Sequence, residues 1–286
     1  MRVRATFLAL ATSLLLPAAS LAAQGAEPPA LVAARSAWQR HPTNVDSIIW
    51  YGRRVGYTGA FAQAVAIYTE GLRLHRDEPR MLRHRGHRYI SMREFAKAIA
   101  DLERARQVVS GKPDEVEPDG QPNARGIPTS TLHSNIRYHL ALAHFVTGDF
   151  ARALPIWEED ARVAPNVDQR VAASFWWVLT LAHLGREADA RRALTPVRAD
   201  WDVIENGSYH RLLLWMKGEI AESALLSATA PTLERQTIGN GIGQWHAAHG
   251  RVAEARAAWE AVLASGPAAS FGFIAAEQAL ARLNRR

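Results

Sequence analysis

Residues 43–76 read TNVDSIIWYGRRVGYTGAFAQAVAIYTEGLRLHR, and residues 77–110 read DEPRMLRHRGHRYISMREFAKAIADLERARQVVS. The two segments align without a gap, at a period of 34 residues. A period of this length with small and aromatic residues at fixed offsets indicates stacked helical hairpins. The coinciding residues include Ile48 with Leu82, Gly52 with Gly86, Phe61 with Phe95 and Ala64 with Ala98, and the same step of 34 carries Pro79 to Pro113 just beyond the second segment.

This pattern resembles the tetratricopeptide repeat (TPR) family, in which W-x2-L-G-x2-Y is followed by a small residue, an aromatic residue, an alanine and a closing proline. The resemblance implies an all-α, right-handed solenoid of helical hairpins that serves as a binding scaffold and not as an enzyme. Small residues let the two helices of a hairpin approach closely, and an aromatic side chain fills the adjacent hollow. Because one hairpin cannot bury its apolar stripe alone, stability comes from stacking neighbours.

The repeat pattern continues over residues 30–286 with varying clarity. Clear repeats are predicted at 43–76, 77–110, 131–165 and 232–267, degenerate repeats at 171–197 and 205–228, and a closing helix at 271–286. The segment 111–130 interrupts the period with the Gly- and Pro-rich sequence GKPDEVEPDGQPNARGIPTS, which predicts a long loop between repeats. Loops of this length are often functional. A plain flexible insertion is the alternative interpretation.

The N-terminus has the pattern of a signal peptide over residues 1–23. Arg2 and Arg4 precede an apolar core at 5–16 and small residues at 17–23, with a cleavage register at 20–22 or 23–25. The core is shorter than the roughly 20 residues that span a bilayer. Residues 24–29 are predicted to be a flexible lead. We therefore expect export to a bacterial periplasm, or to the extracellular space, and no transmembrane segment in the mature chain.

Composition narrows the chemistry further. The chain has no cysteine, which excludes disulfides, thiolate metal sites and cysteine nucleophiles. Its formal charge is +6, and a basic balance of this size is a weak indication of acidic partners. Because the chain is predicted to be exported, nucleic acid is not an expected partner.

In a TPR solenoid the first helix of each hairpin lines the concave groove, so the resemblance implies which side chains face a partner. Tyr209 is added from the polar segment 205–211, whose alternative interpretation is a helix cap. The residues predicted to bind a protein or peptide are Arg53, Tyr57, Arg80, Arg83, His87, Asn135, Tyr138, Tyr209, Asn240 and Gln244.

Four of these side chains, Arg53, Arg80, Arg83 and His87, suggest a clamp for a carboxylate or phosphate, because arginine offers a planar bidentate fork. The expected partner is therefore acidic or carboxylate-terminated, and a solvated basic face is the alternative. The loop carries its own carboxylates nearby in the sequence. A loop folded over the groove would pair with the arginines, as a lid or as an internal occupant. These carboxylates belong to Asp114, Glu115, Glu117 and Asp119.

Metal and cofactor chemistry is not expected. The loop imitates the start of a calcium-binding loop, but Gly126 stands where the bidentate glutamate should be. The pairs His84/His87 and His246/His249 lack a third ligand at suitable spacing for zinc. Residues 239–243 (GNGIG) lack the preceding strand and the spacing of a nucleotide loop, and no hydrolase motif occurs.

Two other functions remain open at this point. One is an enzyme or small-molecule receptor in which the loop 111–130 closes a pocket over His87, Arg83 and Tyr209. The other is a structural subunit of an envelope complex, held through an apolar convex surface. The groove-binding scaffold is the function that the sequence favours.

Overall fold

The computed structural model describes residues 27–118, 120–266 and 269–285. The predicted signal peptide, residues 1–23, lies outside the described residues, as do residues 24–26 of the predicted lead. Apart from one isolated antiparallel bridge between Val116 and Thr131, all regular structure in the described ranges is helical. The prediction of an all-α solenoid of hairpins is confirmed.

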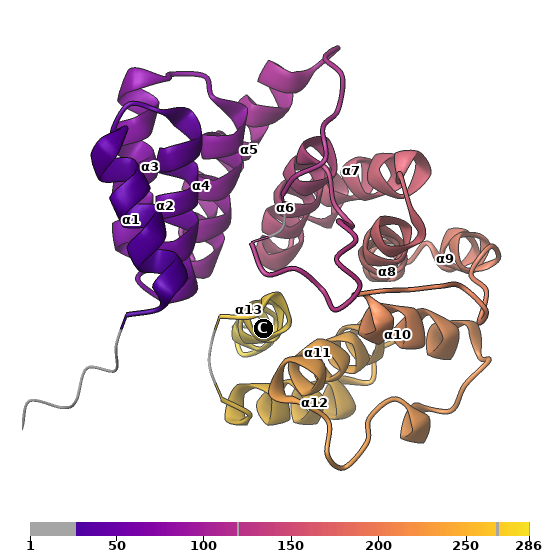
Figure 1. Ribbon diagram of the computed structural model, residues 1–286. Coiled ribbons are helices and arrows are strands. Elements are labelled where there is room, and N and C mark those ends of the chain that lie inside the picture. Colours follow the sequence, from indigo (N-terminus) through magenta and orange to yellow (C-terminus); the bar gives the residue numbers. More distant parts are fainter. Residues whose placement is uncertain (1–26, 119, 267–268, 286) are drawn as a thin grey trace, which may run out of the picture.

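The helices follow one another as antiparallel pairs (Figure 1). They are α1 (Pro29–Arg40), α2 (Val45–Tyr57), α3 (Phe61–Leu74), α4 (Pro79–Ser91), α5 (Phe95–Val109), α6 (Leu132–Thr147), α7 (Phe150–Val163), α8 (Val167–His183), α9 (Glu187–Leu194), α10 (Gly207–Lys217), α11 (Thr232–Ala248), α12 (Val252–Ala264) and α13 (Phe271–Leu283). A short 3-10 helix, Glu222–Ala224, follows α10 where the other hairpins have a second α-helix.

The repeating glycine has a steric cause. A Cβ on Gly52 of α2 would lie 2.6 Å from the Tyr68 ring of α3, and a Cβ on Gly86 of α4 would lie 2.7 Å from Leu102 Cγ of α5. Such short contacts are not tolerated in a close-packed interior. Only glycine therefore lets these two helix pairs approach so closely, which explains why it recurs at this period.

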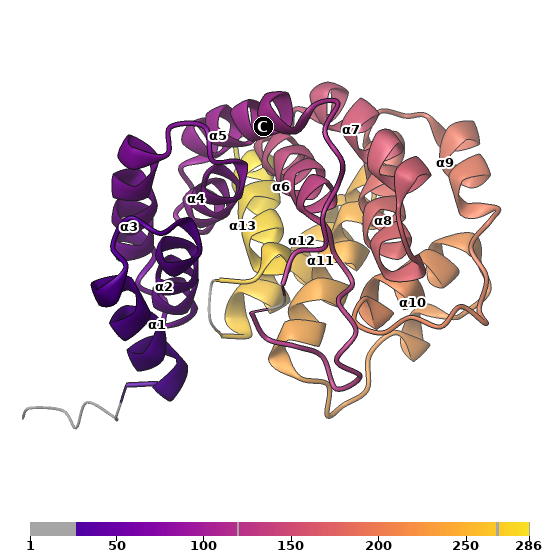
Figure 2. The same ribbon diagram turned by 45° about the horizontal axis from the view of Figure 1, so that its top comes forward.

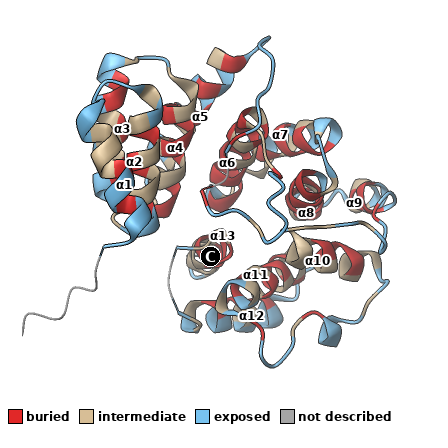
Figure 3. Cartoon of the chain, in the orientation of Figure 1, coloured by how far each residue is buried: buried red, intermediate tan, exposed pale blue. Residues whose placement is uncertain are grey.

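The first helices form the inner side of the solenoid. α2 contacts α4, α4 contacts α6, and α6 contacts α8. Figure 3 shows that buried residues lie on the sides of the helices that face one another. Trp157 and Trp176 are among the fully buried side chains. None of the described helices is both long and apolar enough to cross a membrane.

The last helix folds back onto the inner side of the first hairpins. α13 packs on α11 and α12 and also contacts α6. Figures 1 and 2 show it in the middle of the molecule, between α4 and α6 on one side and α11 on the other. Its Phe271 ring lies 5.0 Å from the His87 ring of α4, and Arg282 donates a hydrogen bond to the Val146 carbonyl of α6. The last helix thus lies against α4 and α6, the first helices of two earlier hairpins.

Hydrogen bonds hold the loop 111–130 to itself, to the start of α6 and to the segment before α10. At its base, Glu117 N–H donates to the Ser130 carbonyl (3.1 Å) and Leu132 N–H donates to the Glu115 carbonyl (2.9 Å). Asn123 and Thr129 also donate to the carboxylate of Glu205, just before α10, at 2.7 Å each. The loop therefore joins α5 to α6 and also contacts the segment before α10.

Candidate functional site

A buried carboxylate marks the site. Glu117 of the loop is 5% exposed and lies against α4 and α6. Its Oε2 is 3.2 Å from Arg83 Nε and accepts a hydrogen bond from Asn135 Nδ2 at 2.9 Å. Its Oε1 is 3.2 Å from His84 Nε2. Arg83 and His84 are themselves buried, so the carboxylate is sealed among cationic and polar groups.

The protonation of His84 follows from its neighbour. Arg83 Nη1 lies 2.7 Å from His84 Nδ1. Because a guanidinium can only donate, Nδ1 accepts, and the ring proton is on Nε2, facing Glu117. Burial holds the pKa of His84 well below its usual range, and the positive charges of Arg83 and Arg53 act in the same direction. His84 is therefore neutral near pH 7, and Arg83 supplies the positive charge at the carboxylate.

The backbone that follows Glu117 is also bound. Arg53 Nη1 donates to the Pro118 carbonyl and Arg54 Nη1 donates to the Gly120 carbonyl, both at 2.8 Å. The guanidinium of Arg53 lies over the Trp50 ring, 4.5 Å from its centroid. Gly120 is buried, and a Cβ on it would overlap the Tyr57 hydroxyl. We call Glu117, Pro118 and Gly120 with these partners the Glu117 site.

Four of the predicted binding residues meet at this site. Arg53 and Tyr57 come from α2, Arg83 from α4 and Asn135 from α6. Arg80 does not join them, because its guanidinium is bound by Asp46 (2.8 Å) and Glu78 (2.9 Å). The predicted four-residue clamp is thus divided, with Arg80 on a separate ion-pair network.

His87 also lies apart from Glu117. Arg88 Nη2 donates to its ring at 2.9 Å from Nδ1, and the ring packs 4.6 Å from His139 and 5.0 Å from Phe271, between centroids. Burial lowers the pKa of His87 well below its usual range, with Arg88 contributing in the same direction. A neutral His87 does not supply a charge for anion recognition.

Tyr138 and Tyr209 are joined by their hydroxyls, 3.1 Å apart, and Trp176 Nε1 donates to the Tyr138 hydroxyl at 3.0 Å. Burial raises the pKa of both phenols. Tyr209 and His87 line one cavity of about 670 Å³, together with Gln121 of the loop and Phe271 of α13. Arg83 is not among the residues that line it. The sequence-based expectation of a pocket over His87, Arg83 and Tyr209 is met for His87 and Tyr209, while Arg83 lies beneath Glu117 instead.

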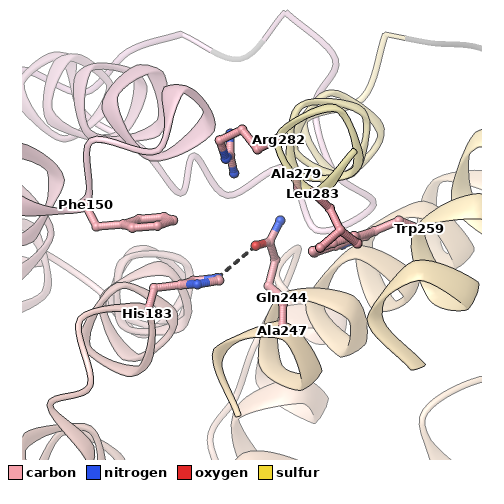
Figure 4. Close-up of a pocket in the computed structure, with 8 residues that line it drawn as sticks. All are labelled: Phe150, His183, Gln244, Ala247, Trp259, Ala279, Arg282 and Leu283. Atoms are coloured by element: carbon pink, nitrogen blue, oxygen red, sulfur yellow. Dashed lines mark hydrogen bonds between the residues drawn. The ribbon is translucent and has the colours of Figure 1, made fainter. Parts of the chain in front are cut away.

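Asn240 and Gln244 are buried side chains of α11, which packs against α13. Gln244 Nε2 donates to Asn240 Oδ1 at 3.1 Å, and Gln244 Oε1 lies 2.9 Å from His183 Nε2. Figure 4 shows Gln244 pointing between His183 and the side chains of α13. The cavity at this point measures about 90 Å³, room for a few water molecules at most. In this arrangement neither residue faces a partner.

Two residues of the Glu117 site were absent from the sequence prediction, His84 and Arg54. His84 lies four residues after Arg80 and three before His87, so it shares their helix face. That spacing could have identified it. Arg54 follows the predicted Arg53 directly, and its role depends on where the loop backbone runs, for which the sequence gives no signal.

Over residues 27–118, 120–266 and 269–285, no group of three or more His, Asp or Glu side chains is placed to hold an ion. The Glu117 site can hold a carboxylate and two of the backbone carbonyls that follow it.

Comparison with known proteins gives the fold. No family model matches the sequence, and no curated protein matches it. Among solved structures, a tetratricopeptide repeat protein from Parabacteroides merdae aligns with TM-score 0.50 and 15% identity, covering 87% of this chain and 90% of that one. YrrB, described as a TPR protein with an unusual peptide-binding site, aligns with TM-score 0.46 and 13% identity, covering 87% of this chain and 100% of that chain. At these identities the likeness concerns the fold.

Proposed function

We propose that this chain, whose fold is that of the TPR proteins, is a protein-binding scaffold that holds an acidic, extended peptide segment against α2, α4 and α6. The observation that carries the proposal is the Glu117 site. There an acidic segment of the chain itself already lies across the three first helices, with its carboxylate and two of its carbonyls bound. TPR-type grooves suit extended peptides because contacts are spread over several hairpins.

The electrostatics of Arg83 support an anion as the occupant. Arg83 is 8% exposed, and a buried guanidinium without a counter-charge is strongly unfavourable. His84 and Asn135 also approach Glu117, but both are neutral and cannot supply that counter-charge. A carboxylate is therefore required at this place, whether the loop or another chain supplies it.

The arginines of α2 add a contact that does not depend on side chains. Arg53 and Arg54 donate to main-chain carbonyls, which every peptide carries. A partner segment would thus be held by one specific carboxylate and by general backbone contacts. This combination is typical of the recognition of extended peptides.

We also propose that the protein is exported, as the sequence of residues 1–23 suggests. The partner is then a protein of the periplasm or of the extracellular space. Mass spectrometry of the N-terminus of the protein from fractionated source cells would test this. A mature protein that retains residues 1–23 in the cytoplasmic fraction would contradict it.

The test of the scaffold function is affinity capture from a periplasmic extract. The bait is the mature chain, beside the variant Arg53→Gln/Arg83→Gln. Arg80→Gln is the matched control, because Arg80 lies on the same face but pairs with Asp46 and Glu78. We expect proteins that the wild type and the control retain, that the double variant loses, and whose retention weakens with salt. Equal retention by all three baits, or by none, would contradict the proposal.

A second function is favoured by the cavity between His87 and Tyr209. Its volume of about 670 Å³ is in the range of small-molecule sites, and aromatic rings and polar side chains line it together. The variant Ser208→Phe would partly fill this cavity without touching Glu117. A compound library screened by thermal shift should give hits on the wild type that this variant loses. Hits common to both proteins would speak against a receptor site here.

A further inference from the structure

The Glu117 site contacts its occupant at the carboxylate and also at two of the residues that follow it. The residue after the glutamate, Pro118, presents its carbonyl to Arg53. Gly120, three residues after the glutamate, presents its carbonyl to Arg54 and has no side chain. In this chain the sequence is Glu117-Pro118-Asp119-Gly120. We infer that the groove recognises the motif Glu-Pro-x-Gly in another protein, and that residues 117–120 are an internal copy of that motif which competes for the site. This inference rests on the proposed scaffold function.

The first position is specific for a carboxylate. Glu117 is approached by Arg83, His84 and Asn135, of which Arg83 carries a charge and lies buried. Glutamine could accept the hydrogen bond from Asn135 but would leave the charge of Arg83 without compensation. The site therefore separates glutamate from glutamine by charge and not by shape.

The proline favours the bound conformation. A residue that precedes proline is biased towards extended backbone, and proline fixes its own φ. Pro118 has no N–H, so its carbonyl is the main-chain group that needs a partner, and Arg53 supplies it. A Glu-Pro segment thus enters the site with less conformational freedom to lose than other sequences.

The fourth position favours glycine, because a Cβ there would displace the ends of two flexible side chains. The nearest atoms to a Cβ on Gly120 belong to the Tyr57 hydroxyl and ring and to Arg53 Nη2. Both side chains are already in use at the site, since Arg53 holds the Pro118 carbonyl. An alanine at this position would displace them and weaken the neighbouring carbonyl contact.

The internal copy is not an ideal occupant. Arg83 Nε and Glu117 Oε1 are both buried, and neither makes a hydrogen bond, although Arg83 Nε lies 3.2 Å from Glu117 Oε2 and Glu117 Oε1 lies 3.2 Å from Nε2 of the neutral His84. The pairing is by charge, without well-directed hydrogen bonds. A tethered segment has an effective concentration in the millimolar range, so the loop will outcompete a free peptide unless its own glutamate is removed.

The experiment uses a labelled, end-blocked peptide of residues 115–121, EVEPDGQ, and fluorescence anisotropy with the full chain. The receptors are the wild type and two variants that release the loop differently: Glu117→Gln, which removes the internal charge, and Gly120→Ala, which disturbs the fit against Tyr57. Two peptide variants, EVQPDGQ and EVEPDAQ, test the first and fourth positions. Circular dichroism confirms that each receptor is folded.

We expect EVEPDGQ to bind both loop-release variants at least about tenfold more tightly than the wild type, because the internal competitor is weakened. Each altered peptide should bind at least about tenfold more weakly than EVEPDGQ. Adding Arg83→Gln to Glu117→Gln should abolish the preference for EVEPDGQ over EVQPDGQ.

Two results would overturn the inference, and they differ in what else they imply. If EVEPDGQ and EVEPDAQ bind the released receptors equally well and both better than EVQPDGQ, the motif is wrong while an anion-binding groove stands. If neither folded variant binds EVEPDGQ better than EVQPDGQ, the motif and the proposed groove function both fail.

Discussion

Arg93 and Glu277 form an ion pair, with 2.7 Å between Nε and Oε2, across 184 residues of sequence. Arg93 lies at the turn between α4 and α5, and Glu277 lies on α13. The pair joins the second hairpin to the last helix and so helps to close the solenoid on itself. Arg93 also has φ of 64°, in the left-handed region where the corresponding turns have Gly59, Gly148 and Gly250.

The conformation of Arg93 leads to a prediction about two substitutions at this position. Arg93→Ala and Arg93→Gly both remove the ion pair with Glu277, but alanine keeps the left-handed strain and glycine relieves it. The alanine variant should therefore be about 1 kcal/mol less stable than the glycine variant. Urea unfolding of the two variants measures this difference. Equal stabilities would show that the turn does not strain a side chain.

The repeat pattern predicted the hairpins because their causes are local. The spacing of Gly52 and Gly86 reflects contacts with Tyr68 and Leu102 in the partner helix of the same hairpin. Such contacts recur with the period and can be read from the sequence. The last helix was predicted as a closing helix, but its contact with α4 and α6 depends on how far the solenoid curves, which no local pattern encodes.

The same distinction applies to the site. Helical register placed Arg53, Arg83 and Asn135 on first helices, and the structure brings all three to Glu117 or to its neighbour Pro118. Register placed Arg80 beside Asp46, one period of 34 residues earlier, but it could not show that this pairing would take Arg80 out of the predicted clamp. Nor could it show which loop carboxylate would enter the site, since the path of a loop is set by tertiary contacts.

The Glu117 pairing predicts a loss of stability in the variant Glu117→Gln. Removing one partner of a sealed buried ion pair costs about 3–5 kcal/mol. Here the loop can open and let water reach Arg83, so we expect about 1–3 kcal/mol. The free energy of unfolding in urea measures it. Glu115→Gln is the matched control, because Glu115 is exposed on the same loop.

Loss of the Glu117 anchor should also expose the loop to protease. Arg125 lies at the exposed end of the loop, where it pairs with Asp202 at 2.8 Å. We expect trypsin to cleave after Arg125 faster in Glu117→Gln than in Glu115→Gln, because local opening precedes cleavage. Identical cleavage rates would mean that Glu117 does not hold the loop in place.

The close approach of Gly120 to Tyr57 predicts that Gly120→Ala loosens the loop as well. The added Cβ overlaps the Tyr57 hydroxyl, and because that side chain is 40% exposed and can move aside, we expect a cost of about 1 kcal/mol. Gly207→Ala is the control, because a Cβ there meets no atom within 4 Å. The double variant Gly120→Ala/Tyr57→Ala should recover part of the lost stability. Additive losses in the double variant would rule out this contact as the cause.

The buried histidines predict that acid destabilises the protein. His84, His87 and His139 come from α4 and α6, and burial holds the pKa of each well below its usual range. Arg83 and Arg88 act in the same direction on all three. The unfolded chain therefore binds protons near pH 6.5 that the folded chain does not, and stability falls as pH drops below that value.

The size and the window of the effect follow from linkage. Each such histidine contributes up to about 1.4 kcal/mol per pH unit between its unfolded and folded pKa. Asp160 acts in the opposite sense, since burial raises its pKa to about 6 and the folded carboxyl gains a proton there before the unfolded one does. The net loss should therefore begin near pH 6.5 and be partly offset below about pH 6.

Urea unfolding at pH 7.5 and at pH 6.0 tests this prediction. The wild type should be less stable at the lower pH. His87→Phe should reduce the difference, because phenylalanine keeps an aromatic ring against Phe271 and His139 but cannot take a proton. His133→Gln at the start of α6 is the control, since His133 is only partly buried and is not part of this cluster. Unfolding energies that stay constant between the two pH values in the wild type would mean that the three rings become protonated as readily in the folded chain as in the unfolded one.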